Sequence, residues 1–180
     1  MNKGYAINDC LYKEDIRRFR DENSLSRREL ATILNVSVKT IEKWEKSDNE
    51  INGPIVFLLA LLNRNPDLIE KYRLPEKKYP LRMYYMENNF VNTVIDVDIM
   101  NRKVSFKNYT DRLILRAFGA KEVVTYEDFE AFLESRCFPR DRDKMKIELE
   151  ALGLRNYDPL AIIRKTEGKM AEDDCRLVIE

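Results

Sequence analysis

The sequence of 180 residues contains no histidine, and this absence removes several chemistries at once. Without an imidazole the chain cannot form a Ser-His-Asp or Cys-His catalytic pair, and a metal site held by histidine is excluded as well. Cysteine is also scarce. Cys10, Cys137 and Cys175 are far apart and odd in number, which argues against a disulfide framework and a Cys-x-x-Cys zinc site. We therefore expect no metal, no cofactor and no enzymatic activity.

Long hydrophobic runs and an excess of one charge are missing too. The longest apolar run is 8 residues, from Ile55 to Leu62, whereas a membrane-spanning helix needs about 20. The first ten residues have no apolar stretch behind a basic segment, so we expect no secretory signal. The 32 basic residues balance the 32 acidic ones, and the composition alone does not indicate a nucleic-acid binder. These features predict a soluble protein of the reducing cytoplasm.

What the sequence does contain is a change of pattern near its middle. Residues 75–80 combine two prolines with three charged residues and lack apolar periodicity, which is typical of a short, stiff linker. We predict one domain over residues 1–74, a linker over residues 75–80 and a second domain over residues 81–180. Because 44% of the residues are apolar, each domain can bury a core.

Short helices follow one another between residues 12 and 72. Ser26 and Glu29 match a capping box, in which each side chain satisfies a free backbone N–H at the start of a helix. Ser37 can cap the next helix, over residues 38–46. The pattern predicts two helices in close succession.

The spacing within this pair is that of a helix-turn-helix. The small Ala31 lets the two helices approach closely, and Asn35 tolerates the left-handed backbone of the turn between them. An apolar set of side chains would fix their crossing so that the second helix projects from the surface. These apolar residues are Leu30, Leu34, Ile41 and Trp44.

The run from Leu30 to Glu45 resembles the Xre/Cro-like helix-turn-helix family, and the resemblance covers about residues 12–72. The continuation, Asn52-Gly53-Pro54 followed by the apolar helix and Asn65-Pro66, is similar to the subgroup found in HigA- and MqsA-type antitoxins. That subgroup usually has a basic loop after the Trp-Glu pair. Here the loop over residues 47–51 is acidic, so the resemblance does not imply a phosphate contact from it.

The resemblance implies that the helix over residues 38–46 enters the major groove of DNA. A lysine there can donate to guanine, Glu42 can accept from cytosine N4, and Val38 can touch a thymine methyl. Ser37 and Arg27 would lie near the backbone, and the arginines and Lys46 can neutralise phosphates. The alternatives are an ordinary solvated face with paired charges, or a degenerate motif used for protein contact. The candidate DNA-binding residues are Arg27, Arg28, Ser37, Val38, Lys39, Glu42, Lys43 and Lys46.

A low positive charge bears on how such a domain would bind. Residues 1–80 carry 15 basic and 13 acidic residues, so the non-specific attraction of one copy to DNA is weak. Domains of this kind bind as dimers on half-sites about 10 bp apart. We therefore predict a homodimer on a pseudo-palindromic operator of double-stranded DNA.

The second half reads as a small antiparallel sheet with covering helices, so we predict an α+β fold that joins an all-α helix-turn-helix domain to a sheet packed with about four helices. The expected strands are residues 81–86, 93–98 and 103–107. Val94, Ile99, Val104 and Phe106 are candidate inward residues. The expected helices are residues 111–118, 126–136, 140–153 and 159–168.

No catalytic constellation emerges in this half. Asp96 and Asp98 could form an acid/base or metal pair, but a solvated strand edge is the favoured interpretation. Cys137 lies among arginines that could lower its pKa, yet it lacks a histidine as base. A local excess of positive charge and an acidic cluster are candidates for binding a protein partner. The candidate partner-binding residues are Arg136, Arg140, Arg142, Glu172, Asp173 and Asp174.

The second half also resembles small uncharacterised proteins of Gram-positive bacteria and their mobile elements, through runs such as Glu127 to Arg140 and Tyr157 to Leu160. Some of those proteins accompany HipA-like kinase toxins, which implies a partner-binding module. The leading hypothesis is an autoregulatory repressor that neutralises a toxin. The alternative is an inhibitor of a defence nuclease, as in some anti-CRISPR proteins, with the same DNA-binding half.

Overall fold

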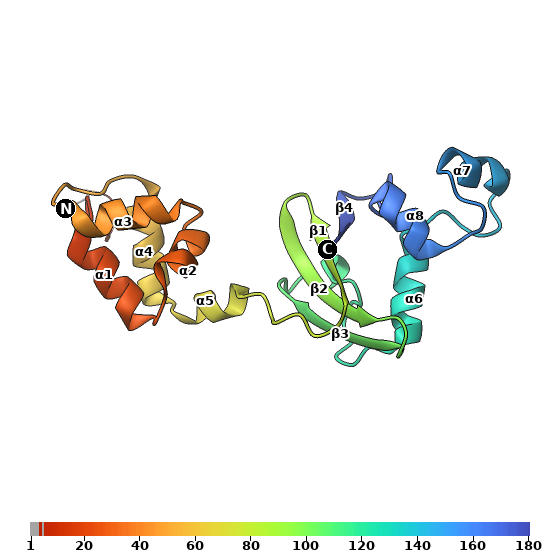
Figure 1. The fold of residues 1–180 in the computed structure, drawn as a ribbon, viewed down its shortest axis with the longest axis horizontal. Coiled ribbons are helices and arrows are strands. Elements are labelled where there is room, and N and C mark those ends of the chain that lie inside the picture. The colour runs from red at the N-terminus through yellow and green to blue at the C-terminus, as the bar shows by residue number, and fades with distance from the viewer. Residues whose placement is uncertain (1–3, 5) are drawn as a thin grey trace. The chain divides into compact units, whose positions relative to one another are not determined.

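The computed structural model describes Gly4 and residues 6–180. The chain divides into two compact units, residues 1–73 and residues 74–180. Figure 1 shows that the first unit, in red to yellow, is helical, and that the second, in green to blue, combines a sheet with helices. Each unit has its own cluster of buried apolar side chains. None of the described helices has the length and apolar character needed to cross a bilayer.

The described part of the first unit contains five short helices. Ile16 and Phe19 are spaced i, i+3 in the first helix and are 0% and 1% exposed, so one face of this amphipathic helix forms core. Tyr12 is the N-cap of the helix and is 45% exposed, so it lies outside this core. Gly53 has φ +99 and precedes the proline that begins the fourth helix. The helices are α1 (Lys13–Glu22), α2 (Arg27–Ile33), α3 (Val38–Lys46), α4 (Pro54–Arg64) and α5 (Asp67–Tyr72).

The second unit is built on a four-stranded antiparallel sheet with the order β3-β2-β1-β4. Met83 of β1 pairs with Ile95 of β2 and with Ile179 of β4. This face of the sheet packs in one core with apolar side chains of α6, α7 and α8. The α+β class is therefore confirmed. The strands are β1 (Leu81–Glu87), β2 (Phe90–Asp98), β3 (Lys103–Asn108) and β4 (Cys175–Ile179), and the helices are α6 (Tyr126–Ser135), α7 (Met145–Ala151) and α8 (Pro159–Thr166).

Three details of the second unit differ from the sequence expectations. The fourth strand, β4, was not expected. The helix expected over residues 111–118 is a single 3-10 turn, η1 (Leu113–Leu115). Hydrogen bonds to side chains replace those of a longer helix: Thr110 Oγ1 accepts from the N–H of Arg112, and Thr93 Oγ1 of β2 accepts from the N–H of Ala117. The helix expected over residues 140–153 is the shorter α7, which begins only after Lys144, because the φ of +62 at Lys144 interrupts a right-handed helix.

Two of the expected inward residues also lie elsewhere. Ile99 is 44% exposed in the turn after β2. Val94 is buried, but it pairs with Tyr84 and so lies on the sheet face opposite to the one that carries Met83 and Ile95. The sheet therefore buries residues on both of its faces.

On that second face, an ion pair holds the segment that joins the units. Arg82 and Asp96 are 5% and 4% exposed, with Nε–Oδ1 and Nη2–Oδ2 distances of 2.6 and 2.7 Å. Asp96 also accepts from the N–H of Lys78 at 2.8 Å. The predicted linker over residues 75–80 thus lies with the second unit. Asp96 is part of the interior, and its interpretation as a solvated edge is wrong.

Candidate nucleic-acid interface

The turn between α2 and α3 forms as its residues predict. Ser26 Oγ accepts from the N–H of Glu29 at 3.2 Å, and Glu29 Oε2 accepts from the N–H of Ser26 at 2.8 Å, which confirms the capping box. Asn35 adopts φ +51 in the turn. Ser37 Oγ accepts from the N–H of Thr40 at 3.1 Å and so caps α3. These local bonds fix where each helix begins and therefore which residues of α3 face outward.

The inner side of α3 is locked against the other helices. Leu30, Ala31 and Ile41 are 0%, 3% and 0% exposed, so the close approach predicted for the small alanine is present. Trp44 is only partly buried and packs at the border of this core. One face of α3 is therefore held rigidly while the other lies in solvent.

The predicted DNA-contacting residues of α3 gather on the outer face. Val38 is 37% exposed, and Glu42, which follows the buried Ile41, is partly buried. Within the described part of the chain, the side chains of Lys39, Lys43 and Lys46 are exposed and form no ion pair. A row of unpaired ammonium groups on a rigid helix can donate to base edges or phosphates.

The predicted DNA contacts at the starts of α2 and α3 differ in whether their polar groups are already bonded within the protein. Ser37 is exposed, but its hydroxyl is engaged in the cap and with Thr40 Oγ1 at 2.9 Å. Arg28 is exposed at the first turn of α2. Arg27 is half exposed, and its Nε is committed to Glu45. Arg27 therefore has a structural role beside any phosphate contact that it makes.

Glu45 holds α3 against α1 and α2. It is 1% exposed, and its carboxylate accepts from Arg20 Nε of α1 at 2.8 Å and from Arg27 Nε of α2 at 2.6 Å. The guanidinium of Arg17 donates to the backbone oxygen of the same residue. Because one carboxylate joins α1, α2 and α3, it sets the position of α3 relative to the two helices behind it.

The charge of Glu45 is maintained by these partners. Burial raises the pKa of the Glu45 carboxyl, but the hydrogen bonds from Arg20 and Arg27 outweigh it and hold the pKa below its ordinary value. Sequence reasoning missed this residue. The available signal was its position four residues after Ile41, which places both side chains on the inner face of α3.

The acidic loop after α3 is neutralised by the start of α1. Lys13 forms an ion pair with Asp48, and its hydrogen bond lowers the pKa of that carboxyl. Tyr12 donates to Glu50 Oε1 at 3.1 Å, and Leu11 pairs with Ile51 through backbone hydrogen bonds of 2.8 and 2.9 Å. This loop is therefore a structural brace between the end of α3 and the start of α1.

The predicted partner-binding residues divide into interior and surface groups. Arg136 is 7% exposed and binds Asp173 through Nη1–Oδ2 and Nη2–Oδ1 distances of 2.6 and 2.9 Å. It also donates to the backbone oxygens of Gly168 and Cys175. This burial corrects the expectation for Arg136, which fastens the start of β4 to α6 and offers no free surface to a partner. Asp173 is engaged with it.

The remaining members of that set lie at the surface. Arg140 pairs with Glu134 and lies over the ring of Tyr157 at 4.6 Å, and Arg142 is 3.3 Å from Glu148. Glu172 and Asp174 are exposed. Among these six residues, the structure thus joins a basic to an acidic one only in the pair of the buried Arg136 and the more exposed Asp173.

The other residues considered for chemistry have structural surroundings. Asp96 is neutralised by Arg82, and Asp98 accepts from Asn101 at 2.7 and 3.0 Å in the turn after β2. Burial raises the pKa of the Cys137 thiol to about 11, so a thiolate at neutral pH is disfavoured. Across residue 4 and residues 6–180, no group of three or more Cys, Asp or Glu side chains is placed to hold a metal ion.

The capped helix pair, its rigid support and its exposed lysines define the chain as a DNA-binding regulator of the helix-turn-helix class. A family model described as "Helix-turn-helix" matches residues 16–63. Antitoxin HigA-2 of Vibrio cholerae serotype O1 is 31% identical over 71 residues, which make up 37% of this chain and 68% of that protein. The chain therefore belongs to the helix-turn-helix family that includes this antitoxin. No solved structure is significantly similar to it.

Proposed function

We propose that the protein is a sequence-specific transcriptional repressor that acts in the cytoplasm as a homodimer on a pseudo-palindromic operator. The observation that carries this proposal is the exposed row of Lys39, Lys43 and Lys46 on a helix whose opposite face is locked by Ile41 and Glu45. A rigid helix presents its side chains to base edges at fixed positions, which sequence-specific reading requires.

The contacts divide by their position on the helices. Val38, Lys39, Glu42 and Lys43 would read bases in the major groove, where lysine donates to guanine and a glutamate accepts from cytosine. Arg28, at the start of α2, and Lys46, in the last turn of α3, would contact phosphates. Arg27 and Ser37 would lie near the DNA backbone. Within the protein, Arg27 also binds Glu45 of α3, and Ser37 caps α3.

Lys39→Ala and Lys43→Ala should each weaken binding at particular base pairs by about 1–3 kcal/mol. The operator can be selected from random duplexes, and the affinity of each variant measured for the operator and for its single-base variants. Lys46→Ala should instead weaken all sequences about equally and reduce the salt slope by about one per copy. A uniform loss for all three lysines would show that the lysines of α3 do not read bases.

We further propose that the second unit binds a protein partner and that the chain is the antitoxin of a toxin-antitoxin pair. The similarity to Antitoxin HigA-2 supports the role, and the separate core of residues 74–180 lies outside the matched helix-turn-helix. The exposed Arg140, Arg142, Glu172 and Asp174 are candidate contacts. Such a protein regulates the expression of its own gene when binding of the partner changes its affinity for the operator.

The test uses the full chain and the product of the neighbouring gene. Copurification of the two proteins, loss of the neighbour's toxicity and a change of operator affinity of about 5- to 150-fold on complex formation would support the proposal. A neighbour that is a phage or defence gene, together with inhibition of a defence nuclease, would favour the alternative function. If the neighbour's product does not bind the chain, the antitoxin proposal fails while the DNA-binding proposal stands.

A further inference from the structure

Strand β4 lies at one edge of the sheet, so one row of its backbone groups has no neighbouring strand. The N–H of Glu180 donates to the carbonyl oxygen of Arg82 in β1 at 2.9 Å. Because backbone groups alternate in direction along an antiparallel strand, Leu177 and Ile179 direct their N–H and C=O groups away from β1. A strand edge of this kind can pair with another extended segment.

The end of α8 covers part of this edge and leaves the rest open. The N–H of Leu177 donates to the carbonyl oxygen of Glu167, the residue after α8, at 2.7 Å. Within the described part of the chain, the C=O of Leu177 and the N–H and C=O of Ile179 have no hydrogen-bond partner. Three main-chain groups are thus open to an added strand.

A groove lies beside these open groups, between β4 and α8. Its volume is about 510 Å³, within the range of about 300–1,000 Å³ that is usual for binding pockets. Ile163 of α8 and Leu177 of β4 line it and are each 1% exposed, so they belong to the core beneath it. Every second side chain of an added strand would point into this groove. We call it the β4 groove, lined by Leu81, Ile163, Arg164, Glu167 and residues 177–180.

The charges of the β4 groove indicate the chemistry of its occupant. The carboxylate of Glu167 is 2.8 Å from Nζ of Lys169. Glu180 accepts from Tyr84 Oη at 2.7 Å. Both carboxylates therefore already have partners within the protein. Arg164 is exposed on the α8 side of the groove and, among the described residues, forms no ion pair or hydrogen bond through its side chain.

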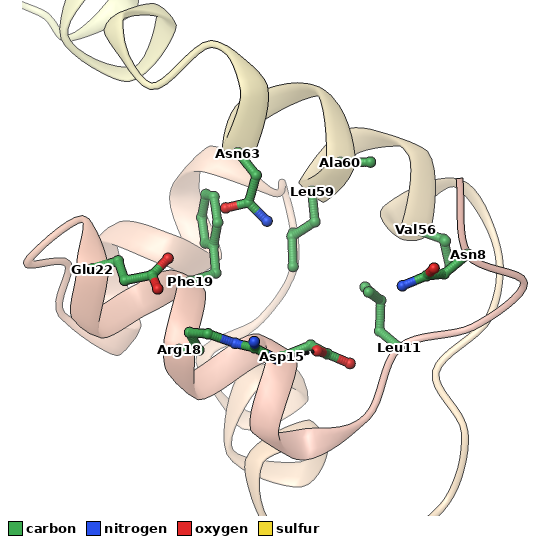
Figure 2. A pocket seen from close by; sticks show the side chains of 10 residues that line it. All are labelled: Asn8, Leu11, Asp15, Arg18, Phe19, Glu22, Val56, Leu59, Ala60 and Asn63. Carbon is green, nitrogen blue, oxygen red and sulfur yellow. Dashed lines mark hydrogen bonds and ion pairs between the residues drawn. The ribbon is translucent and has the colours of Figure 1, made fainter. Parts of the chain in front are cut away.

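A second arginine adds to the positive charge at this edge. Arg176 precedes Leu177 in β4, and its Nε is buried without a hydrogen-bond partner. The hollow between α1 and α4 in the first unit is different, because Asp15 and Arg18 on its rim bind each other at 2.7 Å (Figure 2). The β4 groove keeps unpaired positive charge and therefore fits an acidic occupant.

We propose that the β4 groove receives an extended acidic segment of a partner protein, which adds to β4 as a fifth strand. The main chain of that segment would bond to Leu177 and Ile179, its alternate apolar side chains would fill the groove, and a carboxylate would bind Arg164. A second copy of the chain fits less well, because two such positive surfaces repel each other. The inference specifies the surface for the partner-binding role proposed above and rests on that role.

Short synthetic peptides test the strand addition on the full chain. End-blocked, fluorescein-labelled peptides of about six residues, the usual length of a strand, alternate valine with threonine and carry one aspartate at each position in turn. Fluorescence anisotropy measures their Kd. The best of them should bind at least about tenfold more tightly than its lysine counterpart. Methylation of alternate amide nitrogens should abolish binding in one register and spare it in the other, because only one row of N–H groups faces β4.

Two charge reversals on neighbouring residues of α8 locate the site. Arg164→Glu should weaken binding of the best peptide at least about tenfold, whereas Lys165→Glu, the matched control, should change its Kd by less than about threefold. Both residues are exposed in the last turn of α8, but only Arg164 lines the groove. Far-ultraviolet circular dichroism shows whether each variant keeps the fold.

The proposal is overturned if no peptide of the set binds, if both methylated registers bind like the parent peptide, or if the two reversals have equal effects. A chain that self-associates and is dissociated by the best peptide would also overturn it, because a second copy would then occupy the groove. Peptide binding without binding of the neighbour's product would support the β4 groove and contradict the antitoxin role. If Arg164→Glu binds that product as the native chain does, the groove proposal fails and the antitoxin role stands.

Discussion

Replacement of Glu45 by alanine should lower the free energy of unfolding of the first unit by about 3–5 kcal/mol. The substitution leaves Arg20 with Asp21 as its carboxylate partner and frees Arg27 from α3. The loss is large because both arginines lose a charge-assisted hydrogen bond to the buried Glu45 carboxylate, and these bonds hold α1 and α2 against α3. Urea unfolding followed by Trp44 fluorescence measures the effect, because the tryptophan precedes Glu45 in the same helix.

The same variant should bind operator poorly even where it remains folded, because Glu45 sets the position of α3. Glu42→Ala is the matched control for the unfolding measurement alone, since Glu42 is itself a proposed base contact: it lies on the same helix, is partly exposed and should leave the free energy of unfolding nearly unchanged. Equal stability of the Glu45→Ala and Glu42→Ala variants would show that the three helices are held by apolar packing alone.

Lowering the pH should reproduce part of the destabilisation that Glu45→Ala causes in the first unit. The folded pKa of Glu45 lies below its ordinary value of 4.5, so the stabilisation is fully present above pH 4.5 and is lost as the pH falls through the folded pKa. In the Glu45→Ala variant the same pH range should produce a smaller loss of stability of the first unit. The comparison separates this carboxyl from the others that titrate in acid.

The second large effect is expected for Asp96→Ala, which should destabilise the second unit by about 3–5 kcal/mol. The substitution leaves Arg82 buried without its partner and removes the acceptor for the N–H of Lys78. Far-ultraviolet circular dichroism should show unfolding of the sheet at lower urea, while the transition of Trp44 in the other unit should keep its midpoint. A common shift of both transitions would contradict the assignment of the pair to one unit.

Two control variants make the interpretation of that result specific. Asp98→Ala removes the carboxylate two residues along the strand, which holds only a turn, and should cost about 1 kcal/mol or less. The double variant Arg82→Met, Asp96→Leu should be more stable than Asp96→Ala, because it leaves no unpaired charge in the interior. If the double variant were the less stable of the two, the ion pair itself would be the source of the stability.

The sequence was sufficient where the signals are local. The bounds of α3 follow from Ser37 and the apolar spacing after it, and the turn before α3 follows from Asn35, because caps and turn residues act within a few positions. For the same reason, the start of α8 after Asp158 was predictable: its carboxylate accepts from the N–H groups of Leu160 and Ala161.

The sequence was insufficient where distant residues decide the structure. Arg136 appeared to belong to a basic surface, because its partner Asp173 lies 37 residues away. Glu45 is likewise paired with a residue 25 positions before it. A charged residue in an alternating or helical pattern is ordinarily at the surface, and only a tertiary partner allows its burial. The candidate DNA-contacting residues were accessible to sequence reasoning, whereas their support was not.

The position of β4 in the sheet has a consequence for the order in which the two units form during synthesis. The contacts of the first unit lie within residues 1–73, so this unit can fold early on the ribosome. The second unit needs the pairing of Met83 with Ile179, and its sheet is incomplete until the latter has been made. Each new chain should therefore complete its helix-turn-helix unit before the sheet of its second unit is finished.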